Sequence, residues 1–160
     1  MKTKNLITVF LLIFTVSFFA CDNNRPEEPE ISFPREISFT EFSLVDTSCQ
    51  WINFRYGPRV EVVIINSSDK LKNYTAYTND CLPEIDFTKK SLVVANATAW
   101  PAIVRSTATM FVQLDNKYYE WEIEVTPTML TSVPTPWKTA IIVDKIDVNS
   151  MVDVKITVLR

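Results

Sequence analysis

Seven stretches of the chain have the alternating or β-branched hydrophobic pattern that is typical of β-strands. They cover about 35–44, 60–65, 91–95, 104–114, 117–125, 138–143 and 152–159. The stretch at 91–95 differs from the others, because Leu92-Val93-Val94-Ala95 has no polar residue between the apolar ones. A strand of this kind is expected to be buried on both faces.

One stretch, at about 68–78, has helical spacing instead, because Leu71 and Tyr74 recur at a three-residue interval. Asn66-Ser67-Ser68 precedes it and offers a side-chain oxygen as a helix cap. Asp69 suits the first turn, where the helix dipole favours a negative charge. The sequence therefore predicts one short helix.

Short segments join the predicted strands, and Asp115-Asn116 is expected to form the turn of a hairpin. Seven strands and one helix predict an α+β fold, with mostly antiparallel strands in a curved sheet or a small sandwich or barrel. The chain has 160 residues. After the N-terminal segments described next, its length suits a single globular domain over 32–160.

Residues 1–20 have the order of a secretory signal peptide: Lys2 and Lys4, an apolar run over 6–19, and then the small residue Ala20. The run is about 14 residues long, which is short of the roughly 20 that a membrane-spanning helix needs. Removal of this segment leaves 14 basic residues against 19 acidic ones, a net charge of −5. Nucleic acids and anionic membrane surfaces attract basic patches, so both are disfavoured as partners.

The small residue is followed directly by Cys21, an order that resembles the lipobox of bacterial lipoproteins, with Phe18 in the position where leucine is usual. The resemblance implies a lipid, such as palmitate, on Cys21. It also implies a place in the cell envelope, as an outer-membrane lipoprotein that faces the periplasm or the cell surface. Residues 21–31 are polar, acidic and interrupted by prolines, so a flexible tether is expected between this anchor and the domain.

If Cys21 carries lipid, two cysteines remain, Cys49 and Cys81, in a compartment where disulfides persist. A bridge between them would close a loop of about 33 residues, which chain entropy values at roughly 3–4 kcal/mol. The alternative is two free thiols. A metal site is disfavoured, because structural zinc needs four ligands and the chain has no histidine.

The absence of histidine also removes the commonest general base, and a single glycine cannot form a phosphate-binding loop. Neither a cofactor nor an enzymatic activity is expected. Glu120, Glu122 and Glu124 alternate along one predicted strand at a spacing of about 7 Å, which would suit an inverting glycosidase. We interpret them instead as the exposed face of an amphipathic strand, whose other face holds Trp121 and Ile123.

Near the C-terminus, Asp144, Asp147, Asn149 and Asp153 form a second acidic group. Calcium binds such oxygens, but the spacing matches no EF-hand loop and lacks its glycine. These residues are therefore expected to end strands and to shape a turn.

Three tryptophans, Trp51, Trp100 and Trp137, lie near a cysteine or next to a proline, in predicted connections rather than in strand centres. Aromatic side chains on loops often bind proteins or sugars, so these three and Tyr118 form a candidate binding surface. The alternative is that each tryptophan folds back over the end of a sheet as a lid on the core.

The segments "PEIDFTKKSLVVA" (83–95) and "WKTAIIVDK" (137–145), with a helix before them and a hairpin between them, resemble small secreted lipoproteins of Bacteroidetes-type bacteria. The arrangement is also similar to the C-terminal domain of PrcB-type protease-complex subunits. That resemblance implies a non-enzymatic protein that contacts or stabilises another envelope protein, such as a secreted protease. The family's usual glycine-aromatic step is replaced here by Ala99-Trp100-Pro101-Ala102. The alternative function is a glycan-binding accessory lipoprotein that uses the loop tryptophans.

Overall fold

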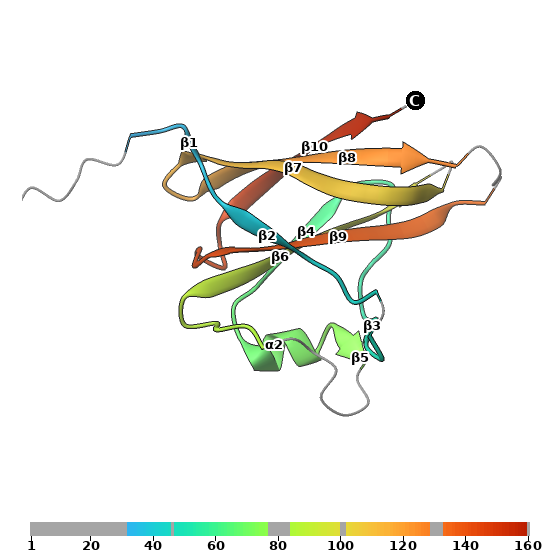
Figure 1. The fold of residues 1–160 in the computed structure, drawn as a ribbon, viewed down its shortest axis with the longest axis horizontal. Helices are drawn as coiled ribbons and strands as arrows, with labels where there is room; N and C mark the ends of the chain where they lie inside the picture. Colours follow the sequence, from blue (N-terminus) through green and yellow to red (C-terminus); the bar gives the residue numbers. More distant parts are fainter. Residues whose placement is uncertain (1–31, 46, 77–83, 100–101, 129–132, 160) are drawn as a thin grey trace, which may run out of the picture. The chain divides into compact units, whose positions relative to one another are not determined.

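The computed structural model describes residues 32–45, 47–76, 84–99, 102–128 and 133–159. These residues form ten strands and one helix (Figure 1). The predicted signal peptide and tether lie outside the described residues, as do Cys21, Cys81 and Trp100. The elements are β1 (Arg35–Glu36), β2 (Phe39–Phe42), β3 (Gln50–Trp51), β4 (Glu61–Ile65), α2 (Ser68–Lys72), β5 (Thr75–Ala76), β6 (Lys90–Ala99), β7 (Ile103–Asp115), β8 (Tyr118–Pro127), β9 (Thr135–Asp144) and β10 (Met151–Val158).

Eight strands form two four-stranded sheets, sheet A in the order β1-β7-β8-β10 and sheet B in the order β2-β9-β6-β4. Their pairings are antiparallel, except that β10 runs parallel to β8. Between β1 and β2 the chain passes from sheet A to sheet B, at Ile37-Ser38. One continuous segment therefore forms an edge of both sheets.

Sheets A and B bury a shared core between them. On β8, Tyr119, Trp121, Ile123 and Val125 are buried and alternate with half-exposed residues, which confirms the predicted amphipathic strand. Phe111 of β7 is fully buried beside two of these rings. Branched and aromatic side chains at every second position thus hold the sheets together.

Strand β6 is buried on both faces, as its unbroken apolar run predicts, and residues 92–95 are all 0% exposed. Val93 and Ala95 face the core shared with sheet A. Leu92 and Val94 face a second core, which α2 and the small sheet of β3 and β5 help to enclose. The described residues therefore form three layers, with sheet B in the middle (Figure 1).

The helix α2 begins where the sequence predicts, with Ser67 as its N-cap. The hydroxyl of Ser67 accepts a hydrogen bond from the backbone N–H of Lys70 at 3.2 Å. The helix ends at Lys72 rather than near 78, because Thr75 belongs to β5 and pairs with β3. Leu71 is its buried contact with the second core.

The fold differs from the prediction in its strand count, closure and class. The described residues form ten strands rather than seven, since β3 and β5 are additional strands of two residues each and the strand predicted at 35–44 is divided into β1 and β2. Over the ranges that the structure describes, the sheets stay open rather than closing into a barrel, and with a helix of only five residues the fold is mostly β rather than α+β. The turn between β7 and β8 lies at Asn116-Lys117, because Asp115 already pairs with Tyr118.

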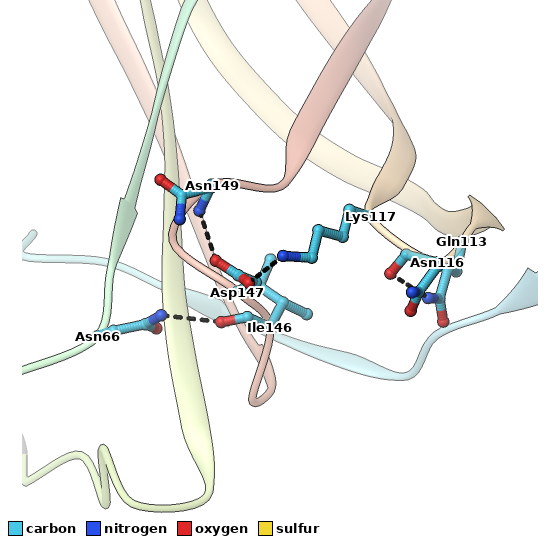
Figure 2. A network of polar contacts seen from close by, with 7 residues as sticks. All are labelled: Asn66, Gln113, Asn116, Lys117, Ile146, Asp147 and Asn149. Carbon is cyan, nitrogen blue, oxygen red and sulfur yellow. Dashed lines mark hydrogen bonds and ion pairs between the residues drawn. The ribbon is translucent and has the colours of Figure 1, made fainter.

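The connection from β9 to β10 returns the chain from sheet B to sheet A, and a polar network holds it in place (Figure 2). The carbonyl of Ile146 accepts a hydrogen bond from the side-chain amide of Asn66 at 2.8 Å. The ammonium of Lys117 pairs with the carboxylate of Asp147, which also accepts the backbone N–H of Asn149 at 2.8 Å. These contacts place the start of β10 beside β8.

Candidate functional site

Strand β10 is one of the two edge strands of sheet A, and its outer side has no partner among the described strands. It is eight residues long and pairs with β8 on one side only, from Met151 opposite Tyr118 to Val158 opposite Val125. An unpaired edge of this length is a template for strand pairing with another chain. We therefore take β10 and its surroundings as the candidate functional site.

The hydrogen bonds to β8 determine which backbone groups of β10 are free. The N–H of Met151 donates to the carbonyl of Lys117 at 2.8 Å, and the N–H of Leu159 donates to the carbonyl of Val125 at 2.9 Å. In a parallel ladder every second residue bonds to the same neighbour. The odd-numbered residues from 151 to 159 therefore face β8. The even-numbered residues 152, 154, 156 and 158 direct their N–H and C=O groups to the free edge.

The side chains of these same even-numbered residues point toward the core, but only half of them are covered. Val152 and Val154 are partly buried against the core shared with sheet B. Ile156 and Val158 lie further along the strand and are 41% and 57% exposed. Exposed β-branched residues beside free backbone groups are typical of a surface that another strand can cover.

A crevice of about 200 Å³ lies next to this exposed end of β10. Its wall is almost entirely apolar. The residues that line it include Ile103, Val125, Pro127, Trp137, Ile156 and Val158. A partner strand at the free edge would have its inward side chains close to this crevice.

The outer face of sheet A is acidic. Glu120 pairs with Lys155 of β10 at 2.7 Å. Among the described residues, neither Glu122 nor Glu124 forms an ion pair. The hydrogen bond to Glu120 raises the pKa of Lys155, so this cation stays charged beside a surplus of carboxylates.

Tyr118 lies on the same acidic face, as the alternation of β8 predicts. Its hydroxyl donates a hydrogen bond to the carboxylate of Asp153 on β10. This bond raises the pKa of Tyr118, because loss of the proton would place two negative charges side by side. Tyr118 therefore ties β8 to β10.

Of the predicted tryptophans, Trp137 is not part of an exposed surface. It lies within β9 and is 7% exposed, in the core between the sheets. β9 continues through Pro136, because β6 is the only described strand that pairs with β9 at this point and a strand with a free edge tolerates proline. Trp51 is half-buried in β3, and Trp100 lies outside the described residues.

The C-terminal acidic group is distributed over separate contacts. Lys90 pairs with Asp144 at 2.7 Å, Lys117 pairs with Asp147, and Tyr118 bonds to Asp153. The hydrogen bonds from the two lysines lower the pKa of Asp144 and of Asp147. In the part of the chain that the structure describes, no cluster of three or more such side chains could hold a metal ion.

Cys49 is buried and disulfide-bonded. Both other cysteines, Cys21 and Cys81, lie outside the described residues. The predicted pairing of Cys49 with Cys81 stays a prediction.

Sequence reasoning missed the open end of β10. Ile156 and Val158 continue the alternation that begins at Val152, so on the pattern alone they belong to the core.

No helix among the described residues has the length and apolar character needed to cross a membrane. No protein-family model, curated protein or solved structure matches this chain.

Proposed function

We propose that this protein is a non-enzymatic, lipid-anchored binding protein of the cell envelope. In this proposal Cys21 carries the lipid, and the folded part contacts another envelope protein, such as a secreted protease. The partner adds an extended segment to the free edge of β10. In this mode backbone hydrogen bonds supply affinity, and alternate side-chain pockets supply specificity.

The free edge of β10 is the observation that carries the proposal. Four residues present unpaired backbone groups there, and two of them, Ile156 and Val158, expose apolar side chains beside an apolar crevice. Proteins usually protect such edges with charges, prolines or bulges. Here Lys155 is the only cation on the strand, and it is paired with Glu120.

The order of elements after residue 60 supports the same proposal, through its resemblance to subunits that bind a secreted protease. The export signal predicted for 1–20 agrees with a partner outside the cytoplasm. A second candidate, glycan binding by the loop tryptophans, is weakened by the burial of Trp137. It retains Trp51, which is half-buried in β3.

Photo-crosslinking in the native envelope tests the proposal. A benzophenone amino acid replaces Thr157, whose exposed side chain lies on the outer face of β10, in the full chain. Irradiation is expected to give one discrete adduct with another protein. The same amino acid at Thr40, on the opposite edge of the molecule, is expected to give none.

A proline at Val154 provides the decisive comparison. The N–H of Val154 points to the free edge, so Val154→Pro removes a donor to the partner and leaves the ladder with β8 intact. The adduct is expected to disappear in Val154→Pro and to persist in Val154→Ala. The proposal would be contradicted if the adduct from position 157 persisted in Val154→Pro. It would also be contradicted if position 157 gave no adduct in the otherwise unchanged chain.

A further inference from the structure

A second hollow, of about 570 Å³, opens where β2 stops beside β9. The pairing of these strands ends at Phe42 opposite Ala140, whereas β9 extends back to Thr135. Residues 135–139 therefore have no described strand on this edge, and β3 and β7 form the other walls. The volume is in the range of small-molecule sites. No residue that lines this hollow, called the β2–β9 cleft below, also lines the crevice beside β10.

The charges in the β2–β9 cleft favour an anion. Arg105 and Lys138 both line it, and neither forms an ion pair within the described residues. The Lys138 ammonium lies 4.8 Å from the ring centroid of Tyr56, which holds the cation without neutralising it. Glu41 is the one carboxylate in the lining, and it already accepts the backbone N–H of Ala108 at 3.0 Å.

The uncharged polar groups of the cleft suit hydroxyl groups of a ligand. Ser43, Gln50, Ser106 and Thr139 all line it. The hydroxyl of Ser106 on β7 donates a hydrogen bond to the hydroxyl of Thr139 on β9 at 3.1 Å. This bond holds the two hydroxyls in fixed positions. Hydroxyls and amides can each donate and accept, which matches a ligand that does both.

One wall of the cleft is aromatic. Trp51 lines it and is half-buried. Phe42 and Phe54 pack against Trp51 edge to face, with ring centroids 5.8 Å and 5.5 Å away. A tryptophan fixed in this way offers a rigid apolar surface with a polar N–H. Sugar rings, which have an apolar face and a polar rim, fit such a surface.

We propose that the β2–β9 cleft binds a short acidic saccharide, in which a carboxylate meets Arg105 and Lys138 and a sugar ring packs on Trp51. This site is separate from the β10 edge, and either can fail without the other. A carboxylate gains charge-assisted hydrogen bonds from the guanidinium. The hydroxyls of the saccharide form hydrogen bonds with Ser106 and Thr139, and with Ser43 and Gln50 beside them.

Calorimetry on the purified full chain tests this site with three probes of matched length: trigalacturonate, a neutral galactose trisaccharide and triglutamate. Saturable binding of trigalacturonate is expected, at least about tenfold tighter than binding of either other probe, because only trigalacturonate combines charge with sugar rings. Tryptophan fluorescence is expected to change with the same midpoint. The affinity is expected to fall as salt is raised.

Substitutions locate the binding. Arg105→Gln is expected to weaken trigalacturonate binding about tenfold or more, since a charge-assisted hydrogen bond is lost. Arg59→Gln makes the same charge change at an exposed residue outside the cleft and is expected to leave the affinity unchanged. Trp51→Phe keeps an aromatic ring in the second core, and it is expected to remove the fluorescence change.

Each contrary result overturns a stated part of the proposal. Equal binding of the neutral trisaccharide refutes the role of the carboxylate, and equal binding of triglutamate refutes the saccharide. Wild-type affinity in Arg105→Gln refutes the location. No saturable binding of trigalacturonate at 10 mM, with the fold intact by circular dichroism, refutes the site as a whole. None of these results bears on the crosslink from β10.

Discussion

At the scale of single residues, Phe111 is a fully buried side chain of the core between the two sheets. It stacks on Tyr119 at 5.4 Å and meets Trp121 edge to face at 6.3 Å. Phe111→Ala is expected to lower the free energy of unfolding by about 3–5 kcal/mol, because it removes buried area and leaves a cavity. Urea denaturation measures this loss. The neighbouring half-exposed Met110 is the control, and a similar loss in Met110→Ala would contradict this account.

At the scale of elements, β10 is expected to tolerate proline at alternate positions only. The N–H of Lys155 bonds to β8, whereas the N–H of Val154 faces outward. Lys155→Pro is therefore expected to lower the free energy of unfolding by about 3 kcal/mol or more. The free energy of unfolding of Val154→Pro is expected to lie within about 1 kcal/mol of that of Val154→Ala. Urea denaturation of the three variants checks this. Equal losses in the two proline variants would show that the assigned ladder is wrong.

The β9–β10 connection is expected to depend on pH through Asp147. Hydrogen bonds from Lys117 and from the Asn149 N–H lower its pKa below the ordinary value of 3.8. A lowered pKa in the folded state stabilises the fold at pH above that value, and the stabilisation is lost as pH falls through the folded-state pKa. Asp147→Asn is expected to lower the Tm at pH 7 and to match the wild type near pH 2.

The matched control for this pH dependence is Glu84→Gln. Glu84 is exposed and takes part in no ion pair among the described residues. Its substitution is expected to leave the Tm unchanged at both pH values. A difference between wild type and Asp147→Asn that persists at low pH would contradict the role given to the Lys117–Asp147 pair.

At the scale of the whole molecule, the predicted disulfide joins the segment before β3 to the segment after β5. If Cys49 pairs with Cys81, replacing both by serine is expected to lower the free energy of unfolding by about 3–4 kcal/mol. Cys21→Ser is expected to leave it unchanged. Peptide mapping without reductant identifies the pair directly, and a peptide that links Cys49 to Cys21 would contradict the assignment.

How far the sequence predicts the fold depends on how local each feature is. The cap at Ser67 needs only its own neighbours in the chain, and α2 begins there as expected. The predicted end of the helix near 78 was wrong, because residues after Lys72 form β5, which pairs with β3. The division of the strand predicted at 35–44 into β1 and β2 arises in the same way, from a long-range pairing of β1 with β7 that no local pattern encodes.

The candidate sites follow the same division. Trp51 was chosen from the sequence, and it lines the β2–β9 cleft, but its position near a cysteine could not reveal the two cations beside it. Arg105 and Lys138 lie on β7 and β9, which belong to different sheets and meet only in the folded chain. Trp137 is buried in the core, which agrees with the second of the two alternatives for the tryptophans, but it lies within β9, which continues through Pro136, and not in a connection.

By itself the sequence determined which residues face inward on β8 and that β6 is covered on both sides, because alternation depends only on the two-residue period of a strand. Only the tertiary structure decided that β10 pairs with β8 in parallel and leaves an open edge, and that β2 ends early beside β9. The physical reason is that partners and edges of strands are set by packing between residues far apart in the chain, which a periodic pattern cannot specify.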